Sequence, residues 1–134
     1  MADRHRYGVL DTCVYIDLGQ LDPMSLPELP ELTTITMAEL HQGVAMARTA
    51  VVRSARAELV GAAIAEFDPL PFDEAAAARY GSLVAVTIEA GRDPRPRRLD
   101  LMIAAIASSR DLPLFTRNSR DFAGLDDLVT VVAV

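Results

Sequence analysis

The chain has 134 residues, 51% of them hydrophobic, which predicts one globular domain over residues 1–134 with a single sizeable core. Its formal net charge of −6 argues against a protein that binds nucleic acid through a uniformly basic surface, although several arginines cluster between Arg92 and Arg98. All thirteen basic residues are arginine, which excludes mechanisms that need an ammonium group. The single cysteine, Cys13, excludes an internal disulfide.

The hydrophobic pattern alternates between strand-like and helix-like segments. Apolar runs rich in β-branched residues predict strands at residues 7–10, 32–36, 65–70, 112–116 and 128–132. Helical periodicity predicts helices at residues 37–47, 51–63, 73–90 and 99–110, with a short helical turn at 121–124. This alternation is typical of βαβ units and predicts an α/β fold with a central parallel sheet. Because no signal-type or bilayer-length apolar run is present, we expect a cytoplasmic protein that does not enter the membrane.

Two acidic residues in the first third of the chain have ordinary structural explanations. Asp11 directly follows the strand at 7–10, where an aspartate commonly caps the next helix. Glu39 ends the sequence Thr36-Met37-Ala38-Glu39, which has the form of a capping box with Thr36 as the cap residue.

The same holds for the acidic residues near the end of the chain. Asp100 stands at the start of the helix at 99–110, where it would complement the positive end of the helix dipole. Asn118 and Asp121 follow the strand at 112–116, and either could cap the short turn that comes next. Taken singly, none of these residues requires a catalytic explanation.

The predicted topology nevertheless brings four acids to one place. In a parallel sheet the carboxyl ends of the strands meet at one edge, so Asp11, Glu39 and Asp121 should lie together there. Asp100 begins a helix that leads into the strand at 112–116, which places it at the same edge. Two unit charges 4 Å apart repel by about 4 kcal/mol at an effective dielectric near 20, so the cluster needs a cation. A hard divalent cation with oxygen ligands, Mg²⁺ or Mn²⁺, would serve, and such sites catalyse phosphoryl transfer.

Four short motifs stand in order along nearly the whole chain. They occupy residues 10–17, 34–40, 100–105 and 115–122, and a helix at 72–80 precedes the third. Together they resemble the PIN-domain ribonucleases, in particular the toxin components of VapBC toxin–antitoxin pairs. The resemblance implies a three-layer α/β/α sandwich, usually a homodimer, that cleaves single-stranded regions of RNA and is held inactive by a cognate antitoxin protein.

The resemblance also assigns roles to residues. It implies that Asp11 and Asp100 bind the metal directly, that Glu39 is a further ligand or orients water, and that Asp121 completes the acidic pocket. Thr12 and Thr116 would support these ligands. Many PIN nucleases carry an acid where this chain has Asn118, and an amide can ligate but brings no charge, which argues against a tightly held second metal.

Arginines close to the motifs are candidates for contacts with RNA phosphates. Arg95, Arg97 and Arg98 precede Asp100 in a proline-containing loop, and Arg117 lies within the fourth motif. A loop of this kind is equally well explained as a solvated turn.

Two other functions remain open at this point. A catalytically inert PIN-like interaction module would keep the fold and the partner surface, and Asn118 in place of an acid is the feature that supports it. A phosphoaspartyl protein, of either the receiver or the haloacid-dehalogenase-like phosphatase type, would also place acids at strand ends. Such proteins normally need a lysine, and the phosphatases need an aspartate where Cys13 stands, so this alternative is the weaker one.

Overall fold

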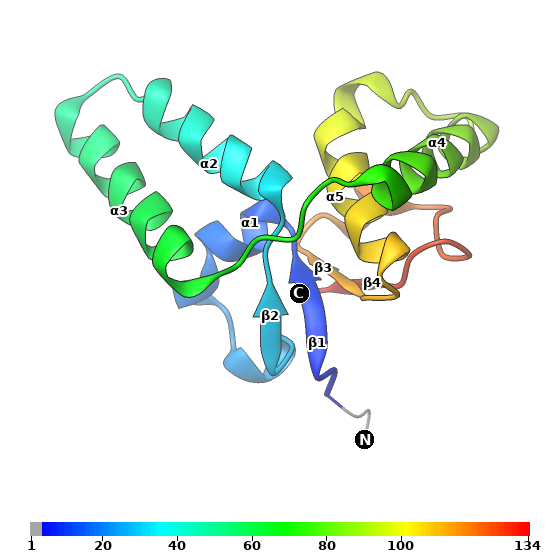
Figure 1. The fold of residues 1–134 in the computed structure, drawn as a ribbon, viewed down its shortest axis with the longest axis horizontal. Helices are drawn as coiled ribbons and strands as arrows, with labels where there is room; N and C mark the ends of the chain where they lie inside the picture. Colours follow the sequence, from blue (N-terminus) through cyan, green and yellow to red (C-terminus); the bar gives the residue numbers. More distant parts are fainter. Residues whose placement is uncertain (1–3) are drawn as a thin grey trace.

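A four-stranded parallel sheet forms the centre of the molecule, as the sequence predicted (Figure 1). The computed structural model describes residues 4–134. The strands are β1 (Tyr7–Leu10), β2 (Leu29–Glu31), β3 (Leu114–Thr116) and β4 (Val131–Ala133), and their spatial order is β2-β1-β3-β4. β1 pairs with β2 on one side and with β3 on the other, so the two central strands are β1 and β3.

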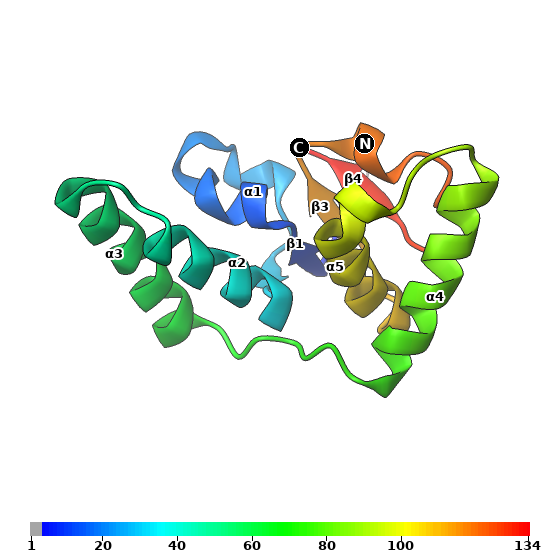
Figure 2. The ribbon, with the colours of Figure 1, turned by 90° about the horizontal axis from the view of Figure 1, so that it is seen from above.

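Five α-helices cover the two faces of this sheet. They are α1 (Thr12–Ile16), α2 (Thr34–Ala45), α3 (Ala50–Glu66), α4 (Glu74–Glu89) and α5 (Arg98–Ser109). Figures 1 and 2 show α1, α2 and α3 on one side of the sheet and α4 and α5 on the other, which confirms the three-layer architecture. The four long helices lie where periodicity predicted them, whereas the five-residue α1 was not predicted. Within residues 4–134, no helix is both long enough and apolar enough to span a bilayer.

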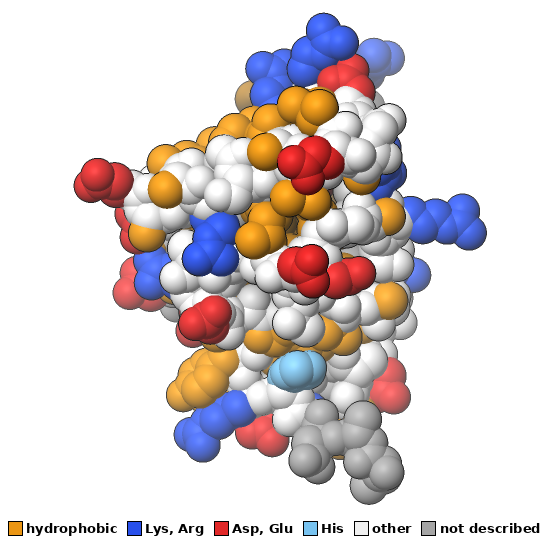
Figure 3. Space-filling model, turned by 90° about the vertical axis from the view of Figure 1, so that its right-hand side faces the viewer, with side chains coloured by type: hydrophobic (Ala, Val, Ile, Leu, Met, Phe, Trp, Pro, Cys, Tyr) orange, Lys and Arg blue, Asp and Glu red, His pale blue; other side chains and the backbone are white. Residues whose placement is uncertain are grey.

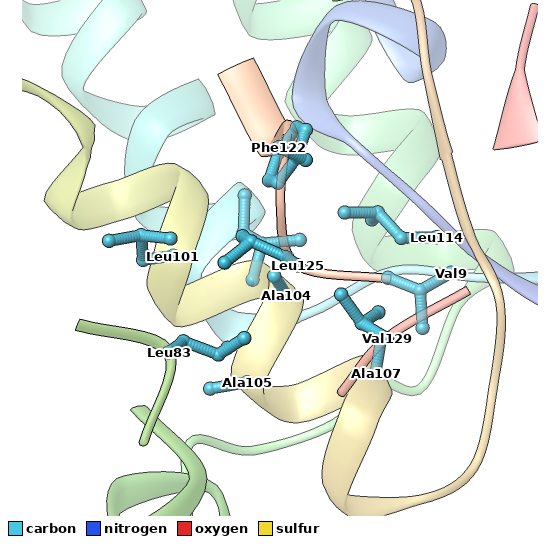
Figure 4. Close-up of a cluster of buried hydrophobic side chains, with 11 residues drawn as sticks. Val9, Leu83, Leu101, Ala104, Ala105, Ala107, Leu114, Phe122, Leu125 and Val129 are labelled. Atoms are coloured by element: carbon cyan, nitrogen blue, oxygen red, sulfur yellow. The ribbon is translucent and has the colours of Figure 1, made fainter. Parts of the chain in front are cut away.

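Alternation along the strands divides the core between the two layers. Val9 and Leu114 are fully buried and belong to the cluster that packs on α4 and α5, which Figure 4 shows around Leu101 and Phe122. The next residue in each strand, Leu10 or Phe115, points to the opposite face and packs with residues of α1, α2 and α3. Each central strand therefore supplies side chains to both halves of the core.

Two predicted strands were wrong. The strand expected at 32–36 is displaced to β2, because Thr33 caps α2: its Oγ1 accepts a hydrogen bond from the Thr36 N–H at 3.2 Å. The run at 65–70 forms no strand, since α3 continues to Glu66 and only an isolated bridge joins Thr33 to Leu70. In both places a helix end overrides the β-branched or apolar composition of the segment.

Candidate active site

Asp11 lies at the carboxyl end of β1 and is almost fully buried, with 4% of its surface exposed. It caps α1, because its Oδ1 accepts a hydrogen bond from the Thr12 N–H at 2.9 Å. Its second oxygen, Oδ2, accepts a hydrogen bond from the Thr116 hydroxyl at 2.8 Å. The cap that the sequence suggested is thus real, and it also fixes a buried carboxylate at the sheet edge.

Glu39 is held by a residue of a different helix. It lies in the second turn of α2, and its Oε1 accepts a hydrogen bond from the Thr12 hydroxyl at 2.8 Å. The predicted capping box is wrong, since Thr33 is the cap residue and Thr36 lies inside the helix, with its hydroxyl 2.9 Å from that of Thr12. Burial raises the pKa of Glu39, the Thr12 hydrogen bond lowers it, and the charge of Asp11 raises it.

Asp100 is the residue on which the charges of the cluster act most strongly. It lies in the first turn of α5, as predicted, and is half-buried. Its pKa is raised to about 6, first by burial and then by the negative charges of Asp11, Glu39 and Asp121, while Arg97 acts in the opposite direction. The structure therefore brings together the four acids that the sequence singled out.

Asp121 reaches this cluster from the 3-10 turn η4 (Ser119–Phe122), which follows β3. It is half-buried, whereas its neighbour Phe122 is buried in the core and anchors the turn. Asn118 occupies the N-cap position of η4 but makes no side-chain capping bond, so the expected cap is not formed there.

The donor set of this cluster fits a hard divalent cation. Its oxygens belong to carboxylates, one of them deeply buried, and the pKa of Asp100 is raised by burial and by neighbouring negative charge, which a cation would offset. In residues 4–134 no three His, Cys, Asp or Glu side chains are arranged as a ligand set at coordinating distances. The four acids thus share an electrostatic environment, and Asp11 and Glu39 are held by threonine hydroxyls in this structure.

Thr116, Asn118 and Cys13 surround the buried carboxylate of Asp11. The backbone N–H of Asn118 donates to Thr116 Oγ1 at 3.0 Å, so Asn118 supports the hydroxyl that holds Asp11. The Asn118 side-chain amide points to Cys13, with Nδ2 3.8 Å from Sγ. Burial raises the pKa of the Cys13 thiol, which favours its protonated and less reactive form.

Arginines form a rim next to the acids. Figure 3 shows basic side chains gathered at the end of the molecule where the loop between α4 and α5 lies. Arg95 pairs with Asp93 at 3.1 Å, and Arg98 Nε donates to the Arg95 carbonyl at 3.2 Å. Arg97 Nη1 donates to the Asp93 carbonyl at 3.0 Å, and Arg97 Nε is buried without a hydrogen-bond partner among the described residues.

Some of these arginines border a cavity next to the acids. Glu39 and Asp100 line a cavity of about 630 Å³ together with Leu99, Arg95 and Arg98. Arg117 lies elsewhere, paired with Asp17 at 2.8 Å. Of the four arginines suggested by the sequence, Arg95 and Arg98 therefore face the space next to Asp100, and Arg97 acts on Asp100 through its charge.

Thr36 is a site residue whose role sequence reasoning missed. It lies three residues before Glu39 on the same helix, a spacing that places both on one face. That signal was present in the sequence, but the same spacing also fits a capping box, and only the position of Thr33 decides between the two.

Comparison with known proteins shows similarity over the whole domain. The chain is 41% identical over 127 residues to Ribonuclease VapC5 of Mycobacterium tuberculosis, a match that covers 92% of this chain and 91% of that protein. It is similar to the solved structure of VapBC-5 from Mycobacterium tuberculosis, a member of the VapBC family of toxin–antitoxin systems, with a TM-score of 0.85, 39% identity and coverage of 96% and 99%. FitAcB from Neisseria gonorrhoeae gives a TM-score of 0.70 at 28% identity, covering 92% and 94%. The chain matches no protein-family model.

Proposed function

Because the chain belongs to the VapC family of ribonucleases, the toxins of VapBC toxin–antitoxin systems, we propose that it hydrolyses phosphodiester bonds in single-stranded regions of RNA with Mg²⁺ as cofactor. The observation that supports the cofactor is the meeting of four carboxylates at the carboxyl edge of the sheet, where burial and the charges of the other three raise the pKa of Asp100. A cluster of this kind is stabilised by a divalent cation.

In this proposal, the residues of the cluster have different roles in binding the metal and the attacking water. Asp11 and Asp100 hold the metal, Glu39 is a further ligand or orients the attacking water, and Asp121 completes the negative pocket. When bound, Mg²⁺ or Mn²⁺ offsets phosphate charge and lowers the pKa of a coordinated water. Thr12 and Thr116 keep Glu39 and Asp11 in place through bonds of 2.8 Å each.

The arginine rim provides the positive charge that RNA needs near an acidic centre. Arg95 and Arg98 line the cavity next to Glu39 and Asp100, so they are placed to contact the phosphates on either side of the cleaved bond. Arg97 lies three residues before Asp100, and Arg117 would contact the strand on the other side of the acids. A protein that acts on cellular RNA would work in the cytoplasm.

The partners we propose are an antitoxin and a second copy of this chain. Large apolar side chains are exposed where α2 connects to α3, including Met46, Val51 and Val52. We propose that the antitoxin covers this surface and places a cationic side chain among the four acids, where it takes the place of the metal. An apolar surface of this kind also suits a homodimer.

The test is RNA cleavage by the purified chain freed of any partner. We expect cleavage with Mg²⁺ or Mn²⁺ and none in EDTA, and we expect Asp11→Asn and Asp100→Asn each to lower the rate by orders of magnitude. Asp73→Asn is the matched control, because Asp73 caps α4 and pairs with Arg110 outside the four-acid cluster, and asparagine caps helices equally well. Undiminished cleavage in EDTA would refute the metal mechanism, and equal losses in all three variants would show that folding was being measured.

A further inference from the structure

Thr36 carries a buried hydroxyl next to the proposed site. The residue is fully buried in the first turn of α2, and its Oγ1 lies 2.9 Å from Thr12 Oγ1. Its backbone N–H already donates to the cap residue Thr33. Among residues 4–134, the Thr36 hydroxyl has no hydrogen-bonding neighbour other than Thr12.

The chemistry of the three groups fixes the direction of the hydrogen bonds. An ionised carboxylate only accepts, so the single hydroxyl hydrogen of Thr12 goes to Glu39 Oε1 at 2.8 Å. Thr12 Oγ1 can then only accept from Thr36, which must be the donor in that pair. The result is a chain with one direction, from Thr36 to Thr12 to Glu39.

The same arrangement occurs at the other held carboxylate. Thr116 donates to Asp11 Oδ2 at 2.8 Å and accepts from the Asn118 backbone N–H at 3.0 Å. In both cases a threonine hydroxyl binds the acid while a second donor fixes the orientation of that hydroxyl. The second donor is a backbone group at Asp11 and a side chain at Glu39, so only the latter can be removed by substitution without altering the backbone.

We propose that Thr36 is a positioning residue for Glu39, which it orients by donating a hydrogen bond to the Thr12 hydroxyl. Accepting a second hydrogen bond further restricts the orientation of the Thr12 hydroxyl, and hydrogen bonds in a buried chain strengthen one another. Thr36 thus limits Glu39 to one position at the rim of the acidic pocket. The inference rests on the proposed nuclease function for its consequence, but not for the geometry itself.

The first test compares Thr36→Val, which removes the hydroxyl at nearly constant shape, with Thr36→Ser, which keeps it. RNA cleavage and the thermal shift caused by Mg²⁺ are both measured against Mg²⁺ concentration. We expect Thr36→Val to raise the half-saturating Mg²⁺ concentration about tenfold, the low end of the range for residues that orient metal ligands. Thr36→Ser keeps the hydroxyl donor and should stay close to wild type. Equal impairment of both variants would overturn the proposal.

Thr87→Val is the matched control. Thr87 is also buried in a helix, but its hydroxyl donates to the Leu83 carbonyl at 2.7 Å inside α4. This variant should lose stability to a similar degree without changing the Mg²⁺ dependence. If it changes the Mg²⁺ dependence as much as Thr36→Val does, a general loosening of the fold explains both and the proposal is wrong.

The second test asks whether Thr36 acts on Glu39 through the Thr12 hydroxyl. Since Thr36 acts on Glu39 only through the Thr12 hydroxyl, Thr36→Val should have no further effect on Mg²⁺ dependence in a Thr12→Val background. An undiminished effect in that background would show that Thr36 does not act through Thr12.

Structures of crystals grown in EDTA test this inference independently of the proposed function. In wild type the Glu39 carboxylate should lie on Thr12, and in Thr36→Val it should leave that position or occupy several. A Glu39 that stays bonded to Thr12 in Thr36→Val would overturn the positioning role. If wild type neither cleaves RNA nor responds to Mg²⁺, the proposed function fails, and the two structures still decide the role of Thr36.

Discussion

At the scale of single residues, burial and mutual repulsion both disfavour the ionised form of the acids in the site. Asp100 shows this most clearly, because its pKa of about 6 in the folded state exceeds the value near 3.9 that an aspartate has in an unfolded chain. The folded state therefore binds more protons than the unfolded state between these two values. The stability that Asp100 contributes is fully present below about pH 4 and is lost as the pH rises through about 6.

We therefore expect metal-free Asp100→Asn to be more stable than wild type at pH 7, by on the order of 1–2 kcal/mol once solvent screening of a half-buried carboxylate is allowed for. The difference should shrink as the pH is lowered toward 4, and the stabilisation by Mg²⁺ at pH 7 should be smaller in the variant. Thermal unfolding in EDTA and in Mg²⁺ measures both. A variant that is less stable in EDTA and keeps the full Mg²⁺ shift would identify Asp100 as a mere helix-start residue.

The four acids and two supporting threonines, Thr12 and Thr116, were expected from the sequence, but which acid each threonine holds was not. Asp11, Asp100 and Asp121 follow or precede strands, and strand ends in a parallel sheet meet at a known edge. Glu39 was predicted on the same ground, although it lies in α2 and not directly after a strand. Its partner Thr12 is 27 residues away, and their contact depends on α1, a helix too short to show a periodic pattern.

At the scale of elements, the backbone of β1 lies close against a side chain of β3 at Gly8. A Cβ atom at Gly8 would lie 2.8 Å from Phe115 Cδ1 and 3.1 Å from Pro27 Cγ, so only glycine allows the two strands and the ring to pack as they do. The ring belongs to the core that carries α1 and α2. The packing of β1 thus contributes to the position of the helices that hold Asp11 and Glu39.

Gly8→Ala should accordingly destabilise the protein by about 1–3 kcal/mol, the usual cost of overpacking a core. Gly61→Ala is the control, because no atom would lie within 4 Å of its Cβ and alanine favours a helix such as α3. Chemical denaturation of both variants measures the difference. Equal stability of the two variants would mean that β1 can shift to accommodate a methyl group. The close packing of Gly8 against Phe115 would then not require glycine.

Elements were predicted well where periodicity extends over several turns and poorly where a cap decides the boundary. The four long helices and the strands β1, β3 and β4 were found from their patterns, with ends shifted by a few residues. The segment at 32–36 has strand composition, but the hydroxyl of Thr33 begins a helix inside it. A single side-chain hydrogen bond of this kind outweighs the average preference of five residues, and composition cannot show it.

At the scale of the whole molecule, the exposed apolar side chains are not confined to one layer. Val51 in α3 is 81% exposed and Ile88 in α4 is 59% exposed. We place the antitoxin on the α2–α3 side because that surface borders the cavity lined by Glu39, Gln42 and Met46. A partner bound there could reach the acids directly.

Val51→Asp should therefore weaken antitoxin binding about tenfold, equivalent to about 1.4 kcal/mol. RNA cleavage by the free protein should be unchanged. Ile88→Asp, which introduces the same charge on the other layer, should leave antitoxin binding as it is. Calorimetric titration of the antitoxin into each variant measures this, and the reverse ranking of the two variants would move the antitoxin surface to α4.

The acids come from both sides of the sheet, with Glu39 on α2, Asp100 on α5 and Asp11 at the edge between them (Figure 1). An ion bound by these residues would link the two helical layers, because the layers could not separate locally without breaking its bonds. We expect Mg²⁺ to slow amide hydrogen exchange around Glu39 in α2 and in the first turn of α5 while leaving the middle of α4 unchanged, and Asp100→Asn to abolish the effect. Binding of the ion would then govern both RNA cleavage and resistance to local opening of the fold. An antitoxin that displaced the ion would itself have to hold the two layers together.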